Sequence, residues 1–98
     1  MTIEIKKCDD QVVLELSGRI DAVTAPTLDS KINENIDLAK SLVFDFKGIE
    51  YVSSAGLRIL LSAQKKMQGK GYLKLKNVCE EVMEVFEMTG FADILTIE

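Results

Sequence analysis

The segment Tyr51-Val52-Ser53-Ser54-Ala55-Gly56-Leu57-Arg58-Ile59-Leu60 marks the point where a buried strand gives way to an amphipathic helix. The first backbone N–H groups of a helix have no partner within the helix and carry the positive end of its dipole. An anionic group is therefore stabilised at a helix start. The two serines of this segment are candidates for a site that is switched by charge.

Helical and extended patterns surround this junction. From Ser54 to about Gln68 the sequence predicts a helix, which ends at Gly69-Lys70-Gly71. Before the junction, the short apolar run Leu42 to Phe46 predicts a central strand, and Ile49 to Val52 leads to the serines. The predicted helix has one stripe that faces the core: Leu57, Leu60, Leu61, Gln64 and Met67.

The N-terminal part predicts a hairpin and then a helix. Strands at Ile3 to Lys7 and Gln11 to Ser17 flank a turn at residues 8–11, and Gly18 is expected to end the second strand. Thr24 is the predicted cap of a helix that has Pro26 in its first turn and runs to about Lys40. Its predicted core stripe is Leu28, Ile32, Ile36 and Ala39.

The C-terminal part predicts a half-buried strand at Tyr72 to Val78, a third helix from about Glu80, and a short final strand at Ile94 to Ile97. Gly90 is the predicted stop of the third helix, and Glu80 and Glu81 suit its positive start. The core stripe expected for this helix is Val82, Val85, Phe86 and Thr89.

The order of these elements defines the fold class. With 98 residues and 47% hydrophobic content, the chain fits one domain over 1–98. The order β-β-α-β-α-β-α-(β) predicts an α/β fold with a mixed sheet of four to five strands, covered by about four helices.

Composition excludes several function classes. The net charge is −4, and no run of Lys or Arg could follow a phosphate backbone, so we expect no direct nucleic-acid partner. Histidine is absent, and Cys8 and Cys79 form no metal-binding motif, so we expect neither a metal nor a cofactor. The start of the chain lacks a signal-peptide pattern and no apolar run approaches a membrane span, which favours a cytoplasmic protein without membrane insertion.

An enzyme is not expected either. Catalysis needs a nucleophile, a base and a group that stabilises developing charge, and the carboxylates show no recognisable pairing. Lys65 and Lys66 lie about three turns from Ser54 on the same predicted helix, too far to take its proton. Gly56 is a weak signal for nucleotide binding and is interpreted as a position of close backbone packing or of an exposed turn.

Three segments together carry a resemblance to a known family. Gly18-Arg19-Ile20-Asp21, Phe44-Asp45-Phe46 and the segment from Tyr51 to Leu57 occur in the order and at the separations of a STAS domain. More narrowly, the chain resembles the bacterial anti-sigma factor antagonists over its whole length. The resemblance implies that Ser54 is phosphorylated by an anti-sigma factor that is also a serine kinase. It also implies that the unphosphorylated form binds this kinase and frees its sigma factor, and that the phosphorylated form releases the kinase until a phosphatase removes the phosphate.

The chain departs from the family pattern at some positions. Ser53 stands where many members have aspartate, so it is an alternative phosphate acceptor to Ser54. Arg58 replaces a common glycine and could contact the phosphate or the partner. Asp21 matches an acidic position near the family's binding surface, but it could equally be a turn or cap residue. The candidate partner-binding residues are Asp21, Ser53, Ser54, Ala55, Gly56 and Arg58.

Other readings remain open for the same sequence. The two serines could simply cap the helix. STAS domains also serve as scaffold subunits of membrane-associated transport or signalling assemblies, in which phosphorylation plays no part. A monomer or weak homodimer is expected. Met67, Met83 and Met88 could fill the core or form an adaptable binding face.

Overall fold

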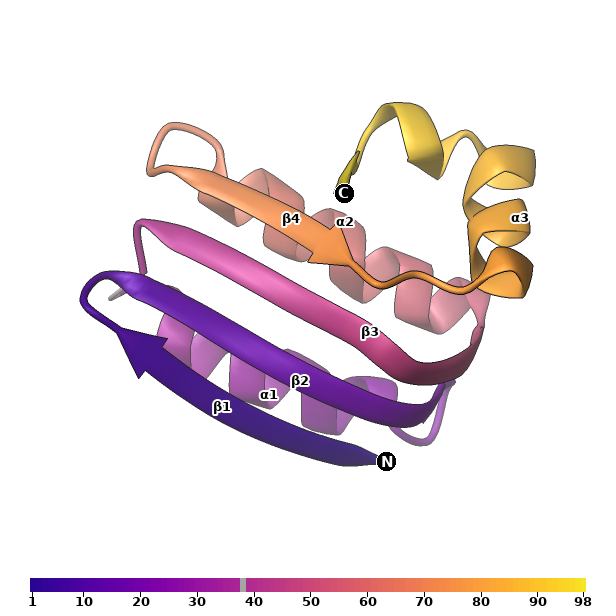
Figure 1. Ribbon diagram of the computed structural model, residues 1–98, viewed down its shortest axis with the longest axis horizontal. Helices are drawn as coiled ribbons and strands as arrows, with labels where there is room; N and C mark the ends of the chain where they lie inside the picture. Colours follow the sequence, from indigo (N-terminus) through magenta and orange to yellow (C-terminus); the bar gives the residue numbers. More distant parts are fainter. Residues whose placement is uncertain (38) are drawn as a thin grey trace.

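The computed structural model describes residues 1–37 and 39–98, and a five-stranded sheet forms its centre (Figure 1). The strands are β1 (Thr2–Cys8), β2 (Gln11–Ile20), β3 (Ser41–Val52), β4 (Tyr72–Lys76) and β5 (Thr96–Ile97). The α-helices of the described residues are α1 (Ala25–Ile36), α2 (Ser54–Met67) and α3 (Glu80–Thr89). The α/β class and the predicted order of elements are confirmed, and a fourth helix exists only as the 3-10 helix η1 (Phe91–Asp93).

The sheet has mixed strand directions in a simple order. Its strands follow the order β1-β2-β3-β4-β5, with β1 antiparallel to β2 and the other neighbours parallel. The crossovers through α1 and α2 advance in the same direction across the sheet, so connections of one hand place both helices on the same face. Figure 1 shows α1 and α2 behind the sheet and α3 at one end of it.

The core lies between the sheet and these helices. Alternate residues of β2, β3 and β4 face it, and the apolar stripes of α1 and α2 cover them. Phe46 of β3 packs against Phe86 of α3, with ring centroids 6.3 Å apart. The fully buried side chains include Leu14, Ile20, Leu28, Ile32, Leu42, Phe44, Leu60, Met67 and Leu73. Met67 is therefore a core residue, whereas Met88 is 86% exposed.

Strands β2 and β3 are longer than the sequence predicts. Gly18 does not end β2, which continues to Ile20. Gly18 has φ = +102°, which suits glycine, and the register with β3 shifts on either side of it. A bulge therefore carries β2 onward to the candidate site. The two predicted segments before the serines form the single strand β3, whereas only Thr96–Ile97 of the predicted final strand pairs with β4.

Helix α1 is shorter than predicted. It ends at Ile36 and not at about Lys40, whose backbone N–H donates to the carbonyl of Asp10 at 2.8 Å. That bond holds Lys40 beside the hairpin turn and outside the helix. The predicted helical position of Leu38 lies outside the described residues.

Two of the predicted helix stripes also need correction. In α3, Val82 and Phe86 are buried, but Thr89 is exposed and its hydroxyl donates to the carbonyl of Val85. In α2, Ala63 is buried. Two other residues of the predicted α2 stripe, Leu61 and Gln64, are only half-buried.

Candidate functional site

The carboxyl ends of β2 and β3 bring together two loops that lie far apart in the sequence. Ile20 and Val52 are register partners at the ends of these parallel strands. The backbone N–H of Ser53 donates to the carbonyl of Ile20 at 2.8 Å, which ties the start of α2 to the end of β2. Asp21 follows Ile20 directly and therefore lies near the serine segment.

The two serines occupy different positions at the start of α2. Ser53 is the N-cap in extended conformation, and its Oγ accepts from the backbone N–H of Gly56 at 3.4 Å. Ser54 is the first helical residue and is exposed. Among the hydrogen bonds of the described residues, none involves the Ser54 side chain. The capping role thus belongs to Ser53, and the Ser54 hydroxyl faces solvent beside unpaired helix N–H groups.

Gly56 allows α2 to approach the sheet closely. It is buried, and a Cβ built on it would lie 2.6 Å from Cγ2 of Ile20 and 3.0 Å from Cγ1 of Val52. Real side chains do not approach each other so closely, so glycine is required for this contact. Gly56 therefore fixes the position of the serines by packing, in line with the reading from the sequence.

Asp21 organises the loop before α1. Its Oδ1 accepts from the backbone N–H groups of Val23 and Thr24, at 3.0 and 3.1 Å. The Thr24 N–H bond is the main cause that lowers the pKa of the Asp21 carboxyl below its ordinary value, although partial burial opposes it. Arg19 lies 3.8 Å from the carboxylate and stacks over the ring of Tyr51 at 4.3 Å.

Thr24 is the N-cap residue of α1, as predicted, but its side chain makes no capping hydrogen bond to the helix. Its Oγ1 donates to the carbonyl of Arg19 at 2.7 Å and accepts from the backbone N–H of Asp21 at 2.9 Å. The hydroxyl is therefore committed to the loop and is not available to the helix.

A groove of about 460 Å³ opens between the starts of α1 and α2. It is mostly apolar, with one carboxylate and one guanidinium at its margin. It contains the predicted site residues Ala55 and Arg58. Its lining is Ala22, Ala25, Pro26, Asp29, Ala55, Arg58 and Ile59.

Several residues near this groove could not be predicted as site residues from the sequence. The groove residues Ala22, Pro26 and Ile59 have no sequence signal beyond their place near the two helix starts. Val23 is 85% exposed and Tyr51 is 41% exposed, so both side chains are accessible at this edge of the sheet. The sequence marks Val23 only as a β-branched residue between the loop residue Asp21 and the start of a helix, which does not predict that it is exposed.

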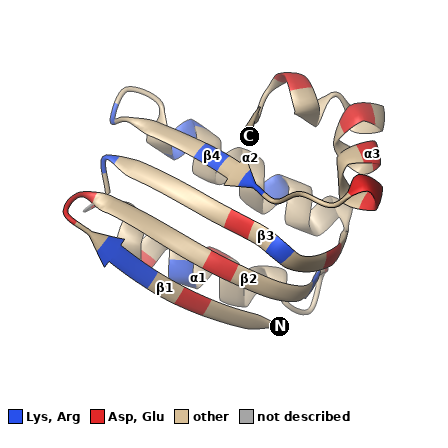
Figure 2. Cartoon of the chain, viewed as in Figure 1, with Lys and Arg blue, Asp and Glu red and all other residues tan. Residues whose placement is uncertain are grey.

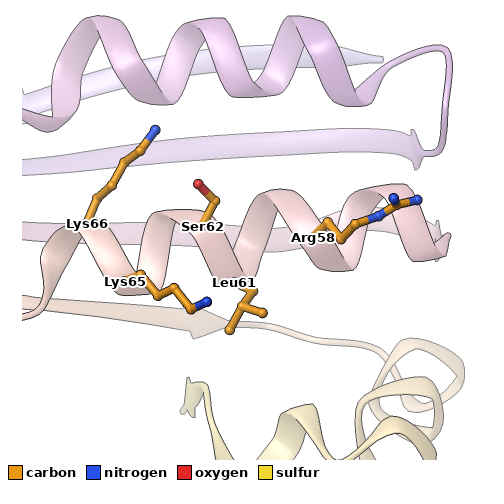
Figure 3. Close-up of a pocket in the computed structure, with 5 residues that line it drawn as sticks. All are labelled: Arg58, Leu61, Ser62, Lys65 and Lys66. Carbon is orange, nitrogen blue, oxygen red and sulfur yellow. The ribbon is translucent and has the colours of Figure 1, made fainter.

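A second groove, of about 410 Å³, runs along the solvent side of α2 (Figure 3). Its lining residues are Arg58, Leu61, Ser62, Lys65 and Lys66, and Lys66 Nζ donates to Oδ1 of Asn33 at 2.6 Å. Arg58 belongs to both grooves, and Figure 3 shows its side chain extended along α2 away from the two lysines.

Neither a metal site nor a membrane-spanning helix is found among the described residues. No three His, Cys, Asp or Glu side chains in this part of the chain lie together as a metal site would require. None of the helices described has both the length and the apolar character needed to cross a membrane.

Comparisons of the sequence and of the fold with known proteins point to one family. The model of the STAS domain family matches residues 2–98. The Anti-sigma-B factor antagonist of Bacillus subtilis is 30% identical over 99 residues, which cover 99% of this chain and 90% of the relative. The crystal structure of an anti-sigma factor antagonist from Mycobacterium paratuberculosis has a TM-score of 0.89 at 27% identity, covering 98% of this chain and 83% of that one.

A more distant match is the structure of the Bacillus cell fate determinant SpoIIAA in its phosphorylated form. It has a TM-score of 0.77 at 18% identity and covers 99% of this chain and 91% of that one, which shows a shared fold. The family match and the 30% identical relative both extend over nearly the whole chain. The chain therefore belongs to the STAS domain family, among the bacterial anti-sigma factor antagonists.

Proposed function

We propose that this protein is an anti-sigma factor antagonist that is switched off by phosphorylation of Ser54. In the unphosphorylated state it binds an anti-sigma factor with serine kinase activity and so releases a sigma factor. A phosphoserine phosphatase returns the phosphorylated form to the binding state. The names of the curated relatives support the antagonist role, and the site geometry supports the choice of serine.

The observation that carries the proposal is the difference between the two serines. Ser53 uses its Oγ to cap α2, so its phosphorylation would remove the contact to Gly56. Ser54 is exposed, and its hydroxyl has no competing bond among the described residues. A kinase can therefore reach Ser54 without unfolding the start of the helix.

Phosphate at Ser54 would change the surface more than the fold. A phosphoserine adds about −1.5 to −2 charge and three acceptor oxygens. The start of α2 offers N–H groups and the positive end of a dipole, which stabilise that charge in place. A partner packed against Ser54 and the groove that includes Ala55 would face steric conflict and the cost of removing water from the phosphate. Binding is lost while the domain stays folded.

The remaining candidate residues have distinct proposed roles. Arg58 and Ala55 contact the partner from the groove between the helix starts. Asp21 holds the neighbouring loop in shape and presents its carboxylate at the same edge of the sheet. Gly56 acts indirectly, because its packing against Ile20 sets the position of α2.

The test compares three tagged proteins expressed in the native cells: the wild type, Ser54→Ala and Ser53→Ala. Each is purified, its phosphate is mapped, and the bound proteins are identified by mass spectrometry. We expect Ser54→Ala to carry no phosphate at this segment and to retain an anti-sigma factor with a kinase domain under all growth conditions. Ser53→Ala should still be phosphorylated at Ser54. A Ser54→Ala protein that releases the kinase as the wild type does would contradict the proposal, and a transporter subunit as the bound protein would favour a scaffold role instead.

A further inference from the structure

The solvent side of α2 carries a row of positive charge. Arg58, Ser62, Lys65 and Lys66 lie at spacings i, i+4, i+7 and i+8, opposite the buried side of the helix. We call these four residues the basic stripe. Arg58, Lys65 and Lys66 are exposed, and Leu61 adds a half-buried apolar surface to the same groove. The stripe therefore combines three cations with a small apolar contact.

Helix α3 carries a matching row of negative charge. Glu80, Glu84, Glu87 and Met88 repeat the spacing i, i+4, i+7 and i+8, opposite the buried Val82 and Phe86. We call these four residues the acidic stripe. All four are exposed, and Glu81 lies beside them. Met88, at 86% exposure, supplies an apolar contact at the end of the row.

Neither stripe is neutralised within the molecule. The ion pairs of the described residues join Lys6 to Glu15, Arg19 to Asp21, Lys31 to Glu34, Lys40 to Asp10 and Lys74 to Glu98. None of them includes a charged residue of the basic or the acidic stripe. Figure 2 shows the two sets of charges on separate elements, blue on α2 behind the sheet and red on α3 at its end. Both stripes are thus open to another molecule.

We propose that the basic stripe of one molecule binds the acidic stripe of a second copy of this chain. Arg58 and Lys65 are seven positions apart, and so are Glu80 and Glu87. In each helix the two residues of such a pair are therefore about 10.5 Å apart along the helix axis. Two helices lying side by side can therefore bring both charges of one row opposite both charges of the other. The apolar side chains of Leu61 and Met88 belong to the same two surfaces and add contact area.

A second copy fits the basic stripe better than a polyanion does. Three cations are too few to follow a nucleic-acid backbone or an anionic membrane. The acidic stripe offers localised negative charge at the matching spacing. Exposed ion pairs contribute about 0.2–1 kcal/mol each, so the association is weak and sensitive to salt.

This contact has a consequence for the site described above. Arg58 belongs both to the basic stripe and to the groove between the helix starts. A second copy bound to the basic stripe would therefore cover one margin of that groove. The association itself does not depend on phosphorylation of Ser54, so its test is separate from the test of the proposed function.

The experiment uses two charge-reversed variants of the full chain. Lys65→Glu/Lys66→Glu makes the basic stripe acidic, and Glu84→Lys/Glu87→Lys makes the acidic stripe basic. Each variant alone has like charges on both surfaces, whereas an equimolar mixture again offers opposite charges. Lys7→Glu/Lys47→Glu is the matched control, since both lysines are exposed and lie on the sheet. Circular dichroism checks the fold, and the single reversals Lys65→Glu and Glu87→Lys replace any variant that unfolds.

Sedimentation equilibrium from about 20 µM to 1 mM protein, in about 20 mM NaCl, measures the association at low screening. We expect the average mass of the wild type and the control to rise with concentration. Each reversed variant should remain monomeric, with at least a tenfold weaker association, and the mixture should recover the rise. A monomeric wild type over the whole range would overturn the proposal, as would a mixture that stays monomeric or a control that loses association equally.

Discussion

Ser53 and Ser54 are adjacent, yet their side chains have different surroundings. Ser53 leaves β3 in extended conformation and caps α2, and Ser54 is already helical and faces solvent. Because β3 ends at Val52, Ser53 takes the N-cap position, and its hydroxyl accepts the hydrogen bond from the helix backbone. Aspartate, the residue that the family resemblance leads us to expect at the position of Ser53, is also a strong N-cap residue. The cap is thus retained in this chain with a neutral side chain.

Replacing the cap should destabilise the fold, whereas replacing the switch serine should not. Ser53→Ala removes the acceptor for the Gly56 N–H and should lower the free energy of unfolding by about 0.5–1 kcal/mol. Ser54→Ala is the matched control, and its free energy should stay within about 0.5 kcal/mol of the wild type. Urea denaturation followed by circular dichroism measures both. Equal losses in the two variants would show that Ser53 is not the cap.

The pKa of Asp21 gives a prediction for acid stability. Hydrogen bonds from the loop backbone, above all from Thr24, lower the pKa of its carboxyl in the folded state. The charged carboxylate therefore stabilises the fold at pH values above its unfolded pKa of about 3.9, and this contribution is lost as pH falls through the lower folded pKa. Asp21→Asn keeps an acceptor oxygen but cannot titrate.

Denaturation curves between about pH 2 and 7 test this prediction. We expect Asp21→Asn to lose less stability than the wild type as pH falls below about 4. An acid dependence that is unchanged in Asp21→Asn would mean that its carboxylate has no stabilising role in the loop.

Among the secondary-structure elements, the packing of α2 on β2 and β3 determines where the candidate site lies. Gly56 lets the first turn of the helix rest on Ile20 and Val52, which are themselves buried. The bulge at Gly18 carries β2 far enough for Ile20 to reach this position. Ser54 and the groove beside it therefore depend on two glycines that do not themselves lie at the surface of the site.

Adding a methyl group at Gly56 should disturb this placement. Alanine is favoured over glycine in a helix by about 1 kcal/mol, but overpacking in a tight core costs about 1–3 kcal/mol. The new Cβ would meet Ile20 and Val52, β-branched side chains with little room to move, so we expect Gly56→Ala to destabilise. Ser62→Ala on the solvent side of α2 is the control and should be neutral or stabilising. Thermal denaturation compares them, and a stabilised Gly56→Ala would contradict the close approach.

Some elements can be predicted from the sequence because their signals are local. The spacing of Leu28 and Ile32 and the stop at Gly90 depend on period and backbone conformation, and they agree with the structure. The continuation of β2 past Gly18 and the end of α1 at Ile36 depend on distant partners, the neighbouring strand β3 and the carbonyl of Asp10. Local patterns carry no information about such contacts.

The site shows the same division. The strand-to-helix junction at Ser53 and Ser54 can be predicted from the change of pattern, whereas only the family pattern marks Asp21. The assignment of the cap to Ser53 alone, and the groove that joins Ala22 to Ile59, require two helix starts to be placed side by side. Their proximity follows from the register of β2 and β3, which a single sequence does not specify.

At the scale of the whole molecule, a negative charge at Ser54 should separate folding from binding. Ser54→Asp places a carboxylate in the first turn of α2, where the helix dipole favours it by about 0.3–1 kcal/mol. We expect the melting temperature to be unchanged or slightly raised, while affinity for the anti-sigma factor falls at least tenfold. Calorimetry and a binding titration measure the two quantities. Loss of stability together with binding would mean that the change acts by unfolding the site.

The most direct test of the switch is intact mass measurement with fragment mapping on the protein isolated from its own cells, grown with and without stress. We expect one phosphate per chain, located on Ser54, in a fraction of the molecules that changes with growth condition. An absence of phosphate under every condition, or phosphate confined to Ser53, would contradict the switch at Ser54.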